Sequence, residues 1–318
     1  MKQLHLFKTE KLPTAVTYGM GVDSTAALIE MARQGIRPDL ILFADTGGEK
    51  QQTYDYEPVF QDWLRQEGFP EIITVRYEPR NFKNWPPYFT LEDNCLTNGT
   101  LPSLAFGFKS CSLKWKVAPQ NKFVQAWPPA QEAWSNGQKV IKVIGYDAGP
   151  SDIRRRNHAG DLADPQYDYQ YPLIEWGWDR QRCIEEIRKA GLEVPCKSAC
   201  FFCPATKPHE LNQFTPDLLR RIVRMEARAA PRLETVEGLW RKSTKSRPGS
   251  MTQYIIDRKL LSREEVQHLI DTTSVKIIAF HQGYAEALAS GRAAEFLAAQ
   301  HPHDYRNGKS FGNALCTS

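Results

Sequence analysis

The feature that most constrains this chain is a glycine-containing loop between a short β-prone run and an amphipathic segment. Residues 15–18 favour a strand, the loop starts at Gly19 and reads Gly-Met-Gly-Val-Asp-Ser, and residues 25–33 have helical apolar spacing that Gly35 ends. Residues 39–44 form a continuous apolar run, which is typical of a strand covered on both faces. The order strand, loop, helix, strand predicts a βαβ unit of a parallel sheet.

The following residues extend this pattern. The spacing predicts a helix over 54–66, strands over 71–77 and 139–145, and a further helix over 179–190. Proline and glycine are frequent over 79–110, which predicts a long loop at one edge of the sheet. We therefore expect an α/β fold, with a Rossmann-like parallel sheet that has helices on both faces.

We expect three regions along the chain. Residues 1–195 would form the nucleotide-binding α/β domain. From residue 196 cysteine, proline and basic residues become dense, so 196–300 would be a cysteine-containing, basic, mainly helical region. The polar residues 301–318 have the composition of a loose C-terminal tail.

Composition limits the compartment and the partners. No run approaches the roughly 18 apolar residues that a membrane helix needs, and the N-terminal residues do not resemble a secretory signal. We expect a cytoplasmic protein with no membrane partner. The seven cysteines, an odd number, favour thiols, metal ligands or catalytic sulfur over a disulfide framework.

The loop has the residues of an anion site at a helix N-terminus. Gly19 and Gly21 would let the backbone approach phosphate and adopt positive φ, and Asp23 and Ser24 stand where a helix cap is expected. Ser24 and Thr25 could donate hydroxyl groups to phosphate, and Asp23 could hold Mg²⁺. The Walker A lysine and the dinucleotide-binding glycine spacing are both missing from the sequence. The alternative is an ordinary turn whose Asp or Ser caps the helix.

The loop resembles the PP-loop of the ATP pyrophosphatase superfamily, whose pattern is Ser-Gly-Gly-x-Asp-Ser. Gly21, Asp23 and Ser24 match that pattern, while Gly19 and Met20 stand in place of its first Ser and first Gly. The resemblance implies a Rossmann-like sheet that binds ATP or an adenylyl sulfate.

Further motifs are similar to the PAPS reductase branch of that superfamily. Asp45-Thr46-Gly47 resembles its Asp-Thr-Gly motif, and Gly145, Ser151 and Arg154 match parts of its Gly-x-Arg-x-x-Glu-Ser-x-x-Arg segment, whose first Arg is missing here. These motifs follow one another in the expected order over roughly residues 14–210. Asp45, at the end of a strand, would be an Mg²⁺ or ribose partner in any such sheet.

The resemblance implies two overlapping sets of site residues. The predicted catalytic residues are Asp23, Ser24, Asp45 and Arg154. The predicted nucleotide contacts are Gly19, Met20, Gly21, Val22, Asp23, Ser24, Thr25, Asp45, Thr46, Gly47, Gly145, Ser151 and Arg155.

Clustered cysteines predict a metal site. Cys196, Cys200 and Cys203 lie within eight residues, and Cys111 could complete a four-sulfur set from the preceding loop. Some members of the PAPS-reductase-like group hold a [4Fe–4S] cluster with such cysteines, and that resemblance implies a cluster here. Zn²⁺ uses the same ligands, and buried structural cysteine is a further alternative. Cys316, on the tail, lacks the motif that surrounds the nucleophilic thiol of assimilatory reductases.

Basic residues gather in the C-terminal half. Residues 197–259 hold thirteen Lys or Arg and six Asp or Glu, a net charge of +7 in a chain whose total is +4. Residues 218–232 place apolar side chains on one helix face and arginines on the other, which suits a nucleic-acid backbone or plain solvation of the helix.

The residues and the resemblance together predict an ATP pyrophosphatase that adenylates a substrate and releases pyrophosphate, so that a sulfur or nitrogen nucleophile can displace AMP. The chain resembles the DndC-like and SspD-like proteins of DNA phosphorothioation systems, or PAPS-reductase-like proteins of phages and mobile elements. That likeness implies DNA and a sulfur-donor protein, such as a cysteine desulfurase, as partners. Two alternatives are a PAPS or APS reductase that acts through a tail thiol, and a nucleotide-binding subunit of a defence complex that cleaves nothing.

Overall fold

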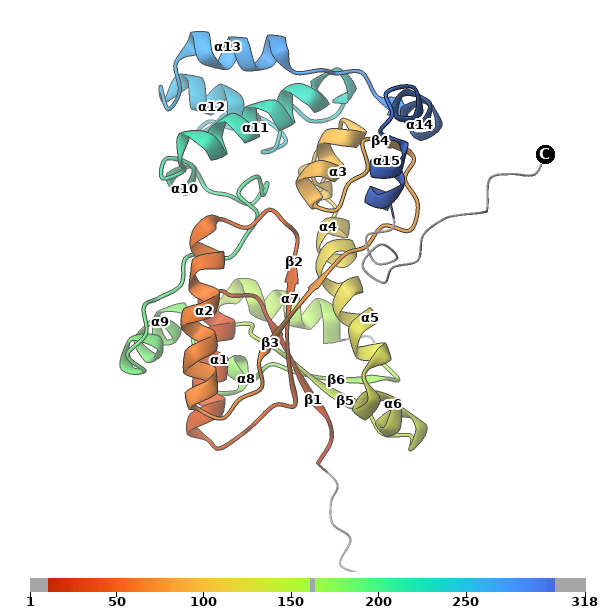
Figure 1. The fold of residues 1–318 in the computed structure, drawn as a ribbon. Coiled ribbons are helices and arrows are strands. Elements are labelled where there is room, and N and C mark those ends of the chain that lie inside the picture. The colour runs from red at the N-terminus through yellow and green to blue at the C-terminus, as the bar shows by residue number, and fades with distance from the viewer. Residues whose placement is uncertain (1–10, 161–163, 301–318) are drawn as a thin grey trace, which may run out of the picture. The chain divides into compact units, whose positions relative to one another are not determined.

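The structure is a computed structural model that describes residues 11–160 and 164–300, shown as a ribbon in Figure 1. The chain forms two compact units. The first runs to Tyr77 and resumes over Ser112–Cys200, and the second takes in Glu78–Cys111 and the chain from Phe201 onward. Residues 78–111, which the sequence places in the first domain, therefore group with the C-terminal half, and residues 196–200 group with the first unit.

A five-stranded parallel sheet forms the centre of the first unit. The strand order is β3-β2-β1-β5-β6, and every neighbouring pair is parallel. The central strand β1 pairs through Val16 with Ile41 of β2 on one side and with Val143 of β5 on the other. The strands are β1 (Thr14–Tyr18), β2 (Leu40–Asp45), β3 (Ile72–Arg76), β5 (Val140–Ile144) and β6 (Tyr167–Gln170).

The order of the strands creates a switch point between β1 and β5. The chain runs from β1 outward to β2 and β3 on one side, and later from β5 outward to β6 on the other. Ligands of open α/β sheets bind beyond the carboxyl ends of the strands at such a reversal. The two strand ends that flank it are Tyr18 and Ile144.

Helices cover both faces of this sheet, as the sequence predicts. The alternation of β2 sends Ile41 and Phe43 to one face and Leu42 to the other. The first face packs against α1, α2 and α9, and the second against α5 and α6, which lie on opposite sides of the strands in Figure 1. The helices of the first unit are α1 (Val22–Arg33), α2 (Gln51–Gln66), α5 (Ala118–Ala126), α6 (Pro128–Ser135), α7 (Pro150–Gly160), α8 (Pro172–Glu175) and α9 (Arg180–Lys189). A short α4 (Ser110–Ser112) and the π-helix η2 (Leu113–Val117) precede α5.

The second unit is mainly helical, with one two-stranded antiparallel ribbon, β4 (Asn84–Trp85) and β7 (Ile278–Ala279). Its longest helix, α11, packs against α3, α12 and α13. The unit contains the helices α3 (Leu91–Asn98), α10 (Pro208–Leu211), α11 (Pro216–Ala229), α12 (Met251–Asp257), α13 (Arg263–Thr272), α14 (Phe280–Ala289) and α15 (Ala293–Gln300), with the 3₁₀ turns η1 (Ser103–Phe106) and η3 (Ala230–Arg232).

The prediction of a long loop over residues 79–110 is wrong in one respect, because the segment contains the helix α3. The Thr90 hydroxyl accepts a hydrogen bond from Asp93 N at 3.0 Å and caps its first turn. Gly99, in the left-handed region at φ 55°, ends it. These capping signals outweigh the frequent proline and glycine on either side.

Within the described residues, no helix is both long enough and apolar enough to span a membrane.

Candidate nucleotide and metal-ion site

The loop after β1 leaves the N-terminus of α1 open. Gly21 is the N-cap residue and supplies no side chain, so within the described residues no N-cap side chain bonds the first N–H groups of the helix. The Ser24 hydroxyl donates to Gly21 O and accepts from Gly19 N, each at 3.2 Å, which holds the loop in a tight turn. The expectation that Asp23 or Ser24 caps the helix is therefore wrong, since both lie in its first turn.

The residue with a positive φ in this loop is Met20, at 54°, rather than Gly19 or Gly21 as the sequence suggests. A non-glycine residue is strained there by about 1–2 kcal/mol. The Met20 side chain is fully buried in the core beneath the loop, which compensates for that strain. Met20 and Val22, whose side chain is also buried, can offer only backbone groups to a ligand.

The Thr25 hydroxyl does not face the loop. Thr25 is fully buried, and its Oγ1 lies 3.2 Å from the hydroxyl of Tyr18 inside the core. The prediction that Thr25 donates its hydroxyl to phosphate is therefore wrong.

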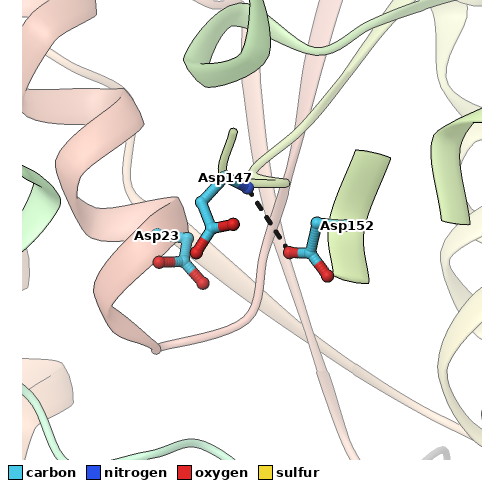
Figure 2. A group of neighbouring side chains, drawn as sticks. All are labelled: Asp23, Asp147 and Asp152. Carbon is cyan, nitrogen blue, oxygen red and sulfur yellow. Dashed lines mark hydrogen bonds between the residues drawn. The ribbon is translucent and has the colours of Figure 1, made fainter. Parts of the chain in front are cut away.

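Three aspartates gather beside this helix start, as Figure 2 shows. Asp23 is in the first turn of α1, Asp147 follows β5, and Asp152 is in the first turn of α7. One carboxylate oxygen from each lies within 4.8 Å of the others. Asp147 N donates to Asp152 Oδ2 at 3.4 Å, which ties the strand end to α7. The group therefore stands at the switch point between β1 and β5.

The charges of this group are only partly balanced. Arg180 donates to Asp23 Oδ2 at 2.7 Å, and Arg155 donates to Asp152 Oδ1 at 2.9 Å. Burial raises the pKa of Asp23 and of Asp152, and the neighbouring carboxylates raise both further. Asp23 Oδ1 is buried and has no hydrogen-bond partner within the described residues. An unpartnered buried oxygen facing two further carboxylates is the donor set that Mg²⁺ uses.

Gly145 allows β5 to reach the first turn of α1. A Cβ at this position would lie 2.7 Å from Ser24 Cα and 2.8 Å from Ser24 N, both backbone atoms that cannot rotate away. Gly145 thus permits the close approach of the end of β5 to the start of α1.

Asp45, at the end of β2, is already engaged. Its Oδ1 accepts from Gly47 N and from the Tyr54 hydroxyl, each at 2.8 Å. Its Oδ2 accepts two bonds from the Arg76 guanidinium, at 2.8 and 3.0 Å. Burial and the Asp45 carboxylate raise the pKa of Tyr54. This carboxylate therefore orders the turn after β2 and carries no spare oxygen for Mg²⁺.

The first unit brings two of the predicted metal-ligating cysteines to the turn after β2. Cys200 Sγ lies 3.1 Å from Thr46 Oγ1, and Cys196 Sγ lies 3.4 Å from Thr53 Oγ1. Glu49 forms an isolated antiparallel bridge with Cys200. The adjacent residue Ser198 lies beside Gly21, 3.5 Å from where a Cβ would stand, so the cysteine segment borders the phosphate loop.

A buried ion pair supports the same turn. Lys116, in the π-helix η2, donates to Glu49 Oε1 at 3.0 Å, and the Glu49 side chain is completely buried. Glu49 Oε2 is buried without a hydrogen-bond partner among the residues that the structure describes.

The other cysteines have different surroundings. Cys111 and Cys203 belong to the second unit, so a four-cysteine metal site remains a prediction. Cys95 and Cys183 are buried, and burial raises the pKa of Cys183 to about 12. Cys316 lies outside the described residues.

The two arginines predicted to act at the nucleotide, Arg154 and Arg155, have different contacts. Arg155 pairs with the acidic group, whereas Arg154 is exposed and its Nε donates to Pro150 O of its own helix at 3.2 Å. Ser151 is exposed in the first turn of α7. Of the two arginines predicted at the nucleotide, Arg155 is the one whose contacts place it at the site.

The basic helix predicted over residues 218–232 exists as α11 and η3, but most of its arginines bind the second unit itself. Arg221 pairs with Glu92, and Arg220 Nε donates to Glu265 Oε1 at 2.6 Å. Arg228 is buried and donates to Leu96 O at 2.7 Å. The arginine face of this helix is therefore largely used inside the fold.

Comparisons with known proteins add little to this geometry. Neither protein-family models nor curated proteins match the sequence. Among solved structures, the chain is similar to the U34-tRNA thiolase NcsA from Methanococcus maripaludis with its [4Fe-4S] cluster, at 11% identity and a TM-score of 0.35, over 96% of this chain and 76% of that one. A TM-score of this size supports no inference about this chain.

Sequence reasoning missed three residues of the candidate site: Asp147, Asp152 and Arg180. Asp147 had a usable signal, because it lies two residues beyond a predicted strand whose end would border the loop. Asp152 and Arg180 carried no such signal, because only the fold brings the starts of α7 and α9 to the start of α1.

Proposed function

We propose that the first unit binds ATP at the Gly19–Ser24 loop and cleaves it to AMP and pyrophosphate while adenylating a substrate. The observation that carries this proposal is the placement of an uncapped α1 N-terminus and three carboxylates at one strand switch point. Free N–H groups and the helix dipole favour phosphate at such a position.

Each component has a distinct chemical task. The backbone N–H groups at the start of α1 hold phosphate oxygens as charge builds on the leaving pyrophosphate. Asp23, Asp147 and Asp152 are the residues that would hold Mg²⁺, which would neutralise phosphate charge. A nucleophilic oxygen of the substrate attacks the α-phosphorus, the α–β bridging bond breaks, and pyrophosphate departs with that electron pair.

The adenylated substrate is set up for sulfur transfer. A thiol reductant releases sulfide from the persulfide of a donor protein such as a cysteine desulfurase, and the thiol is oxidised to a disulfide. The sulfide then attacks the activated carbon or phosphorus, and AMP leaves with the electron pair of the bond that breaks. Cys196 and Cys200 support this proposal because the segment that carries them contacts the turn after β2 and borders the Gly19–Ser24 loop through Ser198. With Cys111 and Cys203 they are the proposed ligands of a [4Fe–4S] cluster or of Zn²⁺. The finer assignment, to the PAPS reductase-like branch and to DNA phosphorothioation or a related modification, rests on the sequence motifs.

A second candidate function is a nucleotide-binding subunit that does not cleave ATP, and Met20 is the residue that raises it. Met20 stands where the PP-loop pattern has glycine. Its backbone adopts a conformation that glycine would favour, and its side chain points into the core. The substitution therefore leaves the loop surface open, which favours the catalytic proposal. A reductase would instead release sulfite from PAPS in a reaction that Cys316→Ser abolishes.

Equilibrium binding of ATP with Mg²⁺ tests the proposed site. Asp23→Ala should weaken Mg²⁺-dependent binding at least about tenfold, which corresponds to about 1.4 kcal/mol. Asp62→Ala is the matched control, because Asp62 is an exposed carboxylate in an i,i+3 surface pair. Equal binding by the two variants would refute the assignment.

A further inference from the structure

The second unit contains a basic loop at residues 240–249, between η3 and α12. It carries four cations and no carboxylate, together with three hydroxyl side chains. The cations are Arg241, Lys242, Lys245 and Arg247. Most arginines of α11 contact partners inside the unit, whereas this loop places four cations within seven residues. The Glu237 carboxylate contacts the loop at Ser243 and lies near Lys242.

Internal hydrogen bonds hold the basic loop in one conformation. Trp240 N donates to Gly249 O at 2.9 Å and closes the loop at its base. At its tip, Thr244 N donates to Arg247 O at 2.8 Å, and the Thr244 hydroxyl accepts from Arg247 N at 3.2 Å. Ser243 N donates to Glu237 Oε1 at 3.0 Å. A loop with these bonds loses little conformational entropy when it binds a ligand.

Arg247 is a partly buried cation that forms no ion pair with another described residue. Its guanidinium lies 4.6 Å from the ring centroid of Trp240, and its Nη1 is buried with no hydrogen-bond partner within residues 11–160 and 164–300. Burial lowers the pKa of Arg247. A buried donor without a hydrogen-bond partner lowers the stability of the fold by about 1–3 kcal/mol, and by more when it is charged. A bound anion would offset this loss.

The neighbouring cations Arg241 and Lys245 are exposed residues. Arg241 and Lys245 form no ion pair within the described part of the chain, and both side chains face solvent. Arg241 adopts a left-handed backbone at φ 71°, and its guanidinium lies near Gly107, about 3.1 Å from where a Cβ would stand. Strained backbone of this kind, at about 1–3 kcal/mol, concentrates at functional positions.

We propose that the basic loop binds the phosphodiester backbone of a nucleic acid. Several cations spaced along one ordered loop match a repeating row of phosphates better than a single anion. The loop reads no base in this proposal. The inference concerns binding alone and does not depend on cleavage of ATP at the first unit.

Fluorescence anisotropy with labelled single-stranded RNA, single-stranded DNA and duplex DNA tests this proposal over a range of salt concentrations. The variant is Arg241→Gln with Lys245→Gln. The control, Arg224→Gln with Lys276→Gln, removes two exposed cations elsewhere in the same unit. The loop variant should weaken binding about tenfold and reduce the slope of log K against log salt by roughly 1.5, since each cation neutralises about one phosphate.

The outcomes separate this proposal from its alternatives. The nucleic acid with the lowest Kd identifies the preferred partner, and any of the three supports the proposal if the loop variant is selectively impaired. Equal loss in the loop and control variants, no binding by the wild type at low salt, or equally strong binding of polyglutamate would overturn it. The loop variant should still bind ATP, and Asp23→Ala should still bind nucleic acid, so failure here is distinguishable from failure of the ATP proposal.

Discussion

Replacing Gly145 by alanine probes the spacing on which the candidate site depends. The new Cβ would stand 2.7 Å from Ser24 Cα, whereas ordinary van der Waals contact begins at 3.4 Å, so the strand end and α1 must separate by about 0.7 Å. Overpacking of this kind costs about 1–3 kcal/mol of unfolding free energy. A displacement approaching 1 Å at a phosphate-binding turn should also weaken ATP binding at least about tenfold.

Gly137→Ala is the matched control for this substitution. Gly137 has φ 70° and nothing within 4 Å of its added Cβ, so alanine there costs about 1–2 kcal/mol through backbone strain alone. Urea unfolding should therefore show a similar decrease in unfolding free energy for both variants. Isothermal titration calorimetry with ATP should show weakened binding only for Gly145→Ala. If the two variants bind ATP equally well, the argument from the close approach to Ser24 is refuted.

Three substitutions and one metal analysis test other parts of the structure. Met20→Gly should lower the unfolding free energy by about 1–4 kcal/mol in urea titrations, because the lost burial exceeds the relieved backbone strain, yet ATP binding should persist. Glu226→Gln should lower the unfolding free energy of the second unit by about 1–3 kcal/mol in the same assay. The two Glu226 carboxylate oxygens accept hydrogen bonds from Leu239 N at 2.7 Å and from Thr252 N at 2.8 Å. In glutamine an NH₂ group replaces one of these oxygens, so one backbone N–H would face a donor and lose its acceptor. Burial raises the pKa of Asp23 in the folded protein, so this group contributes stability below its unfolded pKa and loses that contribution as pH rises through the folded pKa. The difference in unfolding free energy between Asp23→Asn and wild type should therefore favour the variant more at pH 7 than at about pH 4. Binding of Mg²⁺ by the wild type should weaken as acidification protonates Asp23. Protein purified without oxygen should contain iron and acid-labile sulfide in equal amounts, lowered by Cys200→Ser, whereas a colourless zinc protein would contradict the cluster.

Elements defined by local pattern could be predicted from the sequence. The apolar run of β2 and the helical spacing of α1 are properties of adjacent residues, and the structure confirms both within a few residues. The sequence did not reveal α3, because its cap at Thr90 is a weak local signal among prolines and glycines. The strand β6 was also missed, since four residues with polar members carry little periodicity.

The candidate site was only partly predictable, because its chemistry depends on distant residues. Asp23 stood out through its loop, whereas Arg180 reaches it across 157 positions of sequence. The same limit applies to α11, whose arginines looked available for nucleic acid until the fold supplied Glu92, 129 positions from Arg221. Sequence periodicity identified the charged face of that helix but could not identify what neutralises it.

ATP bound at the Gly19–Ser24 loop should be cleaved between its α- and β-phosphates. The most direct test incubates the protein with Mg²⁺ and ATP labelled at the α- and γ-phosphates, with candidate acceptors, and identifies the labelled products. We predict AMP or an adenylated acceptor together with pyrophosphate, both abolished by Asp23→Ala. Release of ADP and phosphate, or pyrophosphate release that Asp23→Ala leaves unchanged, would contradict the account.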